Sequence, residues 1–236
     1  FFISFAKEQN STALMNAENY QKIKTKCEEA GATLVAVSKT KPVKDIQAIY
    51  DFGHRDFGEN KVQEMEDKKD HLPKDLNWHM IGHLQRNKVK YIAPYVHLIH
   101  GVDSLRLFKE INKQGKKAER SVPVLLQMHI AEESSKFGLD NDELEQVLDY
   151  IHLEKPEGVV VSGMMGMATF TEDQDQVKRE FSGLSKLFDV VKRDERLQGH
   201  SFKTLSMGMS GDYEIALDCG SNMIRVGSLI FGARNY

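Results

Sequence analysis

The sequence predicts an α/β fold in the form of a single TIM-type (β/α)8 barrel, with an extra helix at its N-terminus. Three observations support this prediction. Eight short apolar segments alternate with segments whose apolar residues recur every three or four positions. Polar clusters containing Gly, Ser or Asn follow several of the apolar segments, as expected where parallel strands end at a barrel mouth. No Ser/Gly-rich linker divides the 236 residues.

The eight strand candidates are short and rich in aliphatic side chains, which is typical of strands buried on both faces of a parallel sheet. Their number and spacing fit one barrel near the lower end of the usual size. In chain order they occupy residues 33–39, 55–60, 76–82, 96–103, 122–130, 158–168, 202–210 and 222–232.

Helix patterns lie between these strands, and one more precedes the first strand at about residues 17–30. The pairs Asp103-Ser104 and Asn141-Asp142 are suitable N-terminal caps for two of them. A doubly wound open sheet is the alternative fold, but it would require a glycine-rich turn after an early strand. Residues 37–42 contain no glycine. The clearest interstrand helix patterns cover residues 43–52, 104–117, 142–153, 173–193 and 213–217.

Composition excludes several classes of function. The net charge of −3 argues against a nucleic-acid-binding surface, and the mixed charges of residues 61–69 and 186–196 are typical of solvated helix faces. No apolar stretch approaches the roughly 20 residues of a membrane span. Cys27 and Cys219 form neither a metal spacing nor a disulfide framework, so a reducing, cytoplasmic location is expected.

The N-terminal segment differs from the rest of the chain. Residues 1–6 are apolar, but no basic segment precedes them, so they make a poor signal peptide. We expect residues 1–15 to be an extension of unassigned origin and residues 16–236 to form the barrel domain.

Lys39 is the most informative residue of the sequence, because it follows the apolar run of the first strand and precedes Pro42. An amine at a strand end lies where α/β proteins keep their chemistry. Lysine is costly to bury, so such a residue has a charge partner, a covalent role such as a Schiff base with an aldehyde, or an ordinary path to solvent. From its local sequence alone, Lys39 best fits a strand-end lysine whose amine extends to solvent.

The clusters at the ends of strands two and three leave alternatives open. Asn60 offers both a donor and an acceptor at the mouth, whereas Glu59 either belongs to the site or caps the next helix. The spacing of His79 and His83 suggests zinc, but Gly82 lies between them and no cysteine accompanies them, so no metal site is expected. We expect His97 and His100 to be ordinary strand residues.

The clusters at the ends of strands seven and eight predict a phosphate site. The segment 205–212 is a Gly/Ser turn that leads into a helix, and Arg225, Gly227 and Ser228 follow on strand eight. TIM barrels commonly bind phosphate with these two loops, and strands one and eight are neighbours in a barrel. A ligand with both an aldehyde and a phosphate would therefore reach Lys39 as well. The Gly/Met segment 162–167 would admit a flat ligand, although methionines are more often core residues.

These motifs resemble those of the YggS/PROSC family, the pyridoxal phosphate homeostasis proteins. The resemblance covers about residues 16–236, and its motifs occur in the family's order. The matching segments are 36–41 (AVSKTK), 57–60 (FGEN), 79–88 (HMIGHLQRNK), 206–210 (SMGMS), 225–227 (RVG) and 231–234 (FGAR).

The resemblance implies a barrel like the N-terminal domain of alanine racemase that binds pyridoxal 5′-phosphate (PLP) as a Schiff base on Lys39. It also implies a role in intracellular PLP homeostasis, with PLP-dependent apoenzymes as candidate recipients and no established reaction. A monomer is expected. Members often carry Asn where this chain has His129. The implied cofactor-binding residues are Lys39, Asn60, Met165, Ser206, Met209, Ser210, Arg225, Gly227 and Ser228.

The resemblance also places Arg225 against the pyridine nitrogen of PLP. Arginine can only donate hydrogen bonds, so it favours an unprotonated pyridine and weakens the electron sink of the ring. A PLP-dependent racemase or related enzyme is the alternative function. The absence of a second domain carrying a second base argues against racemisation. A phosphosugar aldolase that uses a lysine Schiff base is a third possibility, but such enzymes need a nearby acid or base.

Overall fold

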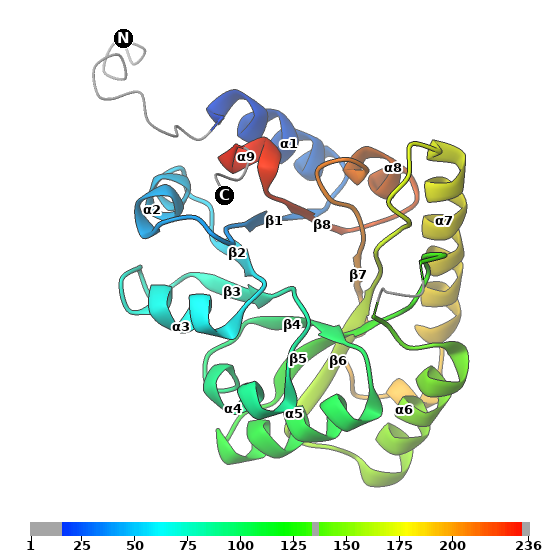
Figure 1. Cartoon of the computed structure of the whole chain (residues 1–236). Coiled ribbons are helices and arrows are strands. Elements are labelled where there is room, and N and C mark those ends of the chain that lie inside the picture. The colour runs from blue at the N-terminus through cyan, green and yellow to red at the C-terminus, as the bar shows by residue number, and fades with distance from the viewer. Residues whose placement is uncertain (1–15, 134–136, 233–236) are drawn as a thin grey trace.

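The computed structural model describes residues 16–133 and 137–232. Eight parallel strands form a closed barrel in sequence order, and helices surround it (Figure 1). The predicted TIM-type barrel is therefore confirmed. The expected extension at residues 1–15 lies outside the described residues.

The strands are short, and each pairs with its neighbours in the chain. The barrel closes where Val35 of the first strand pairs with Arg225 of the last. Their bounds are β1 Thr33–Val37, β2 Asp56–Glu59, β3 Asn77–Met80, β4 Leu98–Val102, β5 Val122–Gln127, β6 Val159–Met165, β7 Thr204–Ser206 and β8 Met223–Val226.

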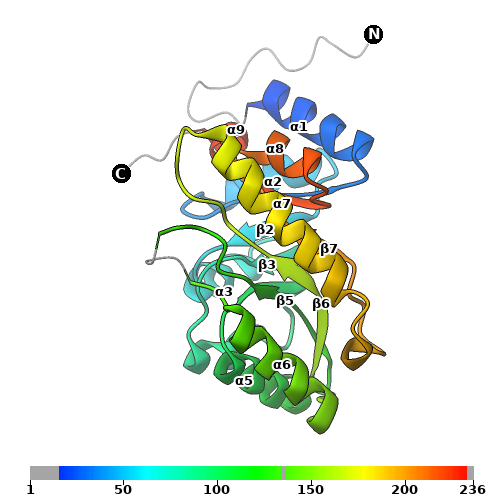
Figure 2. The same cartoon turned by 90° about the vertical axis from the view of Figure 1, so that its right-hand side faces the viewer.

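Helices follow the strands on the outside of the barrel, as the two perpendicular views agree (Figures 1 and 2). The expected additional helix before the first strand is present as α1 Ala17–Glu29. The others are α2 Val43–Asp51, α3 Val62–Lys69, α4 Val89–Ile92, α5 Leu105–Lys117, α6 Asn141–Glu154, α7 Gln174–Val191, α8 Tyr213–Asp218 and α9 Ser228–Phe231, with 3-10 turns at η1 Arg86–Lys88 and η2 Glu195–Leu197.

Apolar side chains are buried in two places. The larger cluster contains residues of both the helices and the strands, including Ile46, Phe108 and Phe181. A smaller cluster contains Val35 and Met165, together with Leu98, Leu125 and Met223. Because alternate strand residues point to opposite faces, five of the strands (β1, β4, β5, β6 and β8) contribute to this smaller cluster as well.

The helix caps match the sequence patterns with one correction. The Ser104 hydroxyl accepts a hydrogen bond from the Leu107 amide, as predicted for the start of α5. The cap of α6 is Asp140 rather than the predicted pair Asn141-Asp142, because Asp140 and Glu143 form a reciprocal capping box.

The predicted strands are longer than the observed ones at their C-terminal ends. The segment 222–232 contains β8 and then the short helix α9, whereas the prediction treated it as one strand. The segment 202–210 contains only the three residues of β7. The extra residues are the polar turns that leave the sheet at the barrel mouth, where hydrogen bonding between strands ends.

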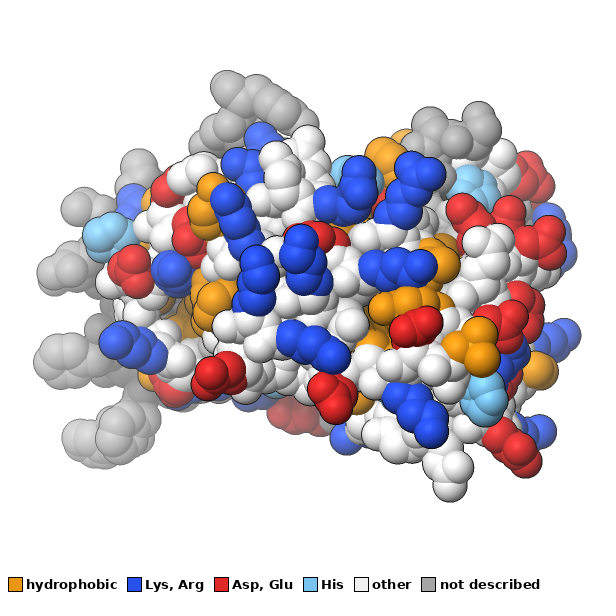
Figure 3. All heavy atoms as spheres, turned by 90° about the horizontal axis from the view of Figure 1, so that it is seen from below, with side chains coloured by type: hydrophobic (Ala, Val, Ile, Leu, Met, Phe, Trp, Pro, Cys, Tyr) orange, Lys and Arg blue, Asp and Glu red, His pale blue; other side chains and the backbone are white. Residues whose placement is uncertain are grey.

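On the face seen in Figure 3, Lys and Arg side chains gather toward the centre, with Asp and Glu side chains around them and small apolar areas between. None of the described helices is both long and apolar enough to cross a membrane.

Candidate functional site

A cavity of about 420 Å³ lies at the mouth of the barrel, where the carboxyl ends of the strands meet. This volume falls within the usual range of small-molecule sites. Seven of the nine residues predicted to bind a cofactor line it. They are Lys39, Asn60, Met209, Ser210, Arg225, Gly227 and Ser228.

Lys39 lies two residues beyond the end of β1, in the turn that leads to α2. The next residue, Thr40, has a positive φ of 64°. A β-branched residue in this region is strained and persists only where its surroundings hold it. The turn at Lys39 is therefore a constrained segment.

Side chains of β2 and α3 hold the residue before Lys39. The Ser38 hydroxyl donates a 2.6 Å hydrogen bond to Glu59, and the Lys68 ammonium donates 2.7 Å and 3.0 Å hydrogen bonds to Glu59 and to the Ser38 carbonyl. All three residues are buried. Ser38 is thus fixed on both its side chain and its backbone.

Glu64 of α3 holds the residue after Lys39. Its carboxylate accepts a 2.7 Å hydrogen bond from the Thr40 amide and a 3.2 Å hydrogen bond from Lys68. The same ammonium therefore links both sides of the turn. Because the flanking residues are fixed, the direction in which the Lys39 side chain leaves the backbone is fixed as well.

The structure excludes one of the two roles left open for Glu59 and corrects the prediction for Lys68. Glu59 does not cap the next helix; its side chain is buried against Ser38 and Lys68. Lys68 belongs to a segment predicted to be a solvated helix face, yet it is only 8% exposed. No sequence pattern separates it from Lys69, which forms a partly exposed pair with Glu66. Only the position of α3 over β2 distinguishes the two lysines.

Burial raises the pKa of Glu59 to about 7, although Lys68 and Ser38 act in the opposite direction. Among the described residues, no group donates a hydrogen bond to its second oxygen, Oε2, which is also buried. A proton on that oxygen removes the cost of an unsolvated charge.

This pKa predicts a pH dependence of stability. Between pH 4.5, the ordinary pKa, and about 7, folded Glu59 holds a proton that the unfolded chain releases. The stabilisation that folding gains from protonated Glu59 is therefore fully present below the unfolded pKa. It is lost as the pH rises through the folded pKa, and the loss in the free energy of unfolding is on the order of 3 kcal/mol.

The measurement is the free energy of unfolding across this pH range for wild type and Glu59→Gln. We expect the variant to gain stability relative to wild type as the pH rises, because glutamine does not titrate. Glu157→Gln, in an exposed pair with Lys116, should follow the wild-type curve. Parallel curves for wild type and Glu59→Gln would contradict the assignment.

The turn after β7 and the start of α9 form the wall of the cavity beside Lys39. Ser210 Oγ accepts a hydrogen bond of 3.4 Å from the Gly227 amide, which joins the two loops. A Cβ on Gly227 would lie 3.1 Å from the Val37 carbonyl oxygen, so a larger residue would crowd β1. Small residues and backbone amides at this wall suit a phosphate group.

Arg225 forms part of the cavity floor and is only 3% exposed. Its guanidinium donates hydrogen bonds of 2.5 Å to Ser206 Oγ and 3.1 Å to the Gly166 carbonyl. Burial lowers its pKa to about 10, and Asp212 partly offsets this effect. The guanidinium is therefore a fixed cation and hydrogen-bond donor at the base of the site.

The two remaining predicted residues do not line the cavity. Ser206 is fully buried beneath Arg225 and also contacts His100. Met165 is buried in the smaller apolar cluster. Their predicted direct contacts with a cofactor stay predictions, and the structure places both behind the cavity wall.

Apart from Met209, sequence reasoning named none of the apolar residues of the cavity individually, although Met167 belongs to the Gly/Met segment expected to admit a flat ligand. Val37, Ile81, Met167 and Phe170 lie around it, and the Phe170 side chain is 95% exposed. An apolar residue next to a polar motif resembles any core residue in the sequence. A flat aromatic ligand would find these side chains beside the polar groups.

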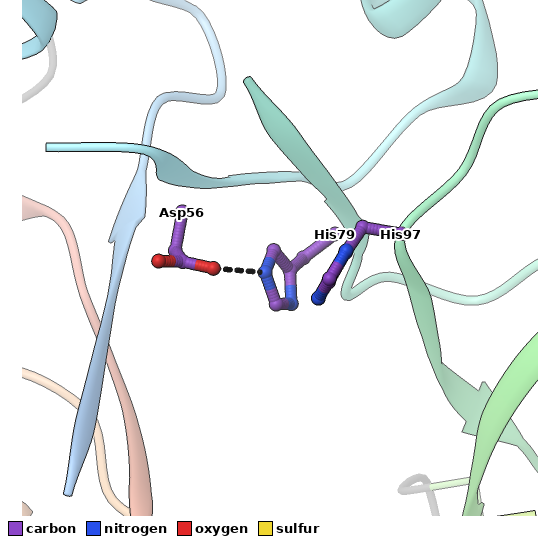
Figure 4. A group of neighbouring side chains, drawn as sticks. All are labelled: Asp56, His79 and His97. Carbon is purple, nitrogen blue, oxygen red and sulfur yellow. Dashed lines mark hydrogen bonds and ion pairs between the residues drawn. The ribbon is translucent and has the colours of Figure 1, made fainter. Parts of the chain in front are cut away.

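The structure brings Asp56, His79 and His97 together elsewhere in the fold (Figure 4). The sequence suggests only His79 and His83 as a pair of metal ligands, and that pair is not expected to bind a metal. It also predicts His97 as an ordinary strand residue, whereas His97 lies just before β4. His83 bonds to Asp103 at 2.9 Å. His79 bonds to Asp56 at 3.0 Å and to His100 at 2.9 Å.

A known protein family and curated proteins match nearly the full length of this chain. The alanine racemase N-terminal domain family matches residues 15–235. The pyridoxal phosphate homeostasis protein of Aquifex aeolicus is 37% identical over 222 residues, which are 92% of this chain and 95% of that protein. The protein of the same name from Escherichia coli K12 is 36% identical over 208 residues, 86% of each.

Solved structures show the same similarity. PipY of Synechococcus elongatus PCC7942, solved with PLP bound, superposes with a TM-score of 0.82 at 30% identity, covering 92% of this chain and 99% of that one. Alanine racemase of Bartonella henselae has a TM-score of 0.65 at 16% identity, with coverage of 92% and 60%. This second likeness concerns the fold alone.

Proposed function

We propose that this chain, which belongs to the pyridoxal phosphate homeostasis proteins within the alanine racemase N-terminal domain family, binds PLP and takes part in PLP homeostasis. The relatives carry that name, and PipY was solved with PLP bound. We further propose that Lys39 holds the cofactor as a Schiff base.

The observation that supports this proposal is that a constrained lysine and a small-residue turn line the same cavity. Lys39 would bind the aldehyde, while Ser210, Gly227 and Ser228 would hold the phosphate. The hydrogen bond between Ser210 and the Gly227 amide keeps the two phosphate loops together. The donors thus fit a ligand that has an aldehyde and a phosphate.

Bound PLP supplies an electrophilic carbon and an electron-accepting ring. The chain's residues would orient that ring and limit its chemistry. Arg225 can donate to the pyridine nitrogen but cannot protonate it readily, because its guanidinium stays charged. The clamp formed by Ser38, Glu59 and Lys68 would hold Lys39 toward the cavity.

A carrier role is favoured over racemisation by the set of groups in the cavity. Racemisation needs a base on each face of the substrate carbon. Among the described residues that line the cavity, three titratable groups besides Lys39 could be considered. Arg225 stays charged, Lys41 donates to the Phe231 carbonyl, and Asp212 accepts from the Met209 amide. We propose that the protein is a cytoplasmic monomer that delivers PLP to apoenzymes.

The test is an absorption spectrum of the purified protein after PLP is added, followed by borohydride reduction and peptide mass spectrometry. We expect a visible band that borohydride bleaches, and a reduced adduct on the peptide that contains Lys39. Assays of alanine and serine stereochemistry should show no turnover at rates typical of enzymes. Rapid racemisation would establish the enzyme alternative, and absence of the band would refute PLP binding.

Ser210→Ala should weaken binding of PLP but not of pyridoxal, which lacks the phosphate. The variant loses one hydrogen bond to a charged group, so we expect the dissociation constant for PLP to rise roughly tenfold. Titration of both ligands, followed by absorbance, measures the difference. Equal losses for PLP and pyridoxal would place the phosphate elsewhere.

A further inference from the structure

The end of the barrel opposite the cavity carries a second cluster of chemically capable side chains. Asp56 begins β2, His79 lies within β3, and His97 directly precedes β4. His79 pairs with Leu98 in the sheet, so His97 lies beside it at the amino end of the strand. Figure 4 shows the three side chains converging from neighbouring strands.

The three side chains offer ligand atoms that almost fit a metal ion. A carboxylate oxygen and one nitrogen from each histidine lie within 4.8 Å of one another. A tetrahedral zinc ion separates its nitrogen and oxygen ligands by about 3.3 Å. Asp56 Oδ1 and His79 Nε2 are already 3.0 Å apart. His97 is exposed, so its ring can turn to close the remaining distance.

Neighbouring residues orient two of these ligands. His79 uses its other nitrogen, Nδ1, in a 2.9 Å hydrogen bond with His100 Nε2, and His100 contacts Ser206 at 3.3 Å. The Asn77 amide donates to Asp56 Oδ1 at 3.1 Å. Histidine ligands of metals characteristically hold their second nitrogen in this way, which fixes the ring and leaves Nε2 for the ion.

We propose that Asp56, His79 and His97 form a three-ligand site for a divalent ion of the zinc class, with water as the fourth ligand. The donor set of two imidazoles and one carboxylate suits Zn²⁺ and Co²⁺ rather than Mg²⁺ or Ca²⁺. To bind the ion, His79 would present Nε2 without a proton and keep its single ring proton on Nδ1, toward His100, so a neutral ring would change tautomer and release no proton to solvent. The site is separate from the cavity at Lys39.

The test uses the full-length protein after free PLP has been dialysed away. Isothermal titration calorimetry then measures its binding of Zn²⁺. We expect saturable one-to-one binding, and Co²⁺ should give the visible spectrum of a tetrahedral ion. His97→Ala should weaken binding at least tenfold. Because His97 is exposed, this variant should fold normally.

His71→Ala is the matched control, because His71 is also exposed but lies at the end of α3, outside the cluster. It should bind zinc with the wild-type affinity. Nitrogen NMR should show zinc-dependent shifts of His79 and His100 but not of His71. No saturable binding, or unchanged affinity in His97→Ala, would overturn the proposal. The latter result would show that the ion binds through other ligands.

Discussion

Replacement of Lys39 by alanine is expected to abolish the covalent attachment of PLP and to weaken its binding at least about 100-fold. Lys39 lines the cavity together with the phosphate loops, and charged side chains hold the residues on both sides of it, with the pair on the Ser38 side buried. The visible band and the borohydride-trapped adduct should both disappear, while the phosphate loops retain weak binding. Absorbance titration and intact mass spectrometry measure these effects.

Lys41→Ala is the matched control, because Lys41 lies in the same turn and also lines the cavity. Its ammonium donates a 2.8 Å hydrogen bond to the Phe231 carbonyl, which directs it toward α9. This variant should keep the visible band and the adduct on Lys39. An adduct that persists in Lys39→Ala but disappears in Lys41→Ala would assign the anchor to Lys41 instead.

Replacement of Lys68 by methionine is expected to destabilise the protein by roughly 3–5 kcal/mol, because it leaves Glu59 buried without its charge partner. The Lys68–Glu59 distance is 2.7 Å, and the Glu59 side chain has no exposed surface. The effect should be largest above pH 7, where Glu59 is ionised, and smaller in acid. Urea unfolding at about pH 8 and at lower pH measures it.

Lys69→Met is the matched control, because Lys69 is the neighbour of Lys68 in α3. Lys69 pairs with Glu66 at 3.1 Å, but both side chains are more than a quarter exposed, so the loss should be at most about 1 kcal/mol. Lys68→Met should also reduce PLP binding, since Lys68 holds the Ser38 carbonyl beside Lys39. Similar stability losses for the two lysines would contradict the buried clamp.

Local patterns were sufficient for predicting the barrel and most of its mouth. The periodicity of apolar residues indicates which faces of a strand or helix are buried, and it can be seen in a short stretch of sequence. The polar turns after β1, β7 and β8 could be recognised because parallel strands bring their carboxyl ends to one rim. Ser206 and Met165 belong to the recognised motifs but do not line the cavity, since adjacent residues of a strand point to opposite sides.

The sequence by itself determined the fold class, the anchor candidate Lys39 and the loops beside it. Only the tertiary structure decided that Lys68 is buried against Glu59 and that Asp56, His79 and His97 converge. Each of these contacts joins residues of different elements, so its existence depends on strand register and on how a helix packs over the sheet. Single residues carry no signal of that register, whereas closure of the barrel fixes it for all eight strands at once.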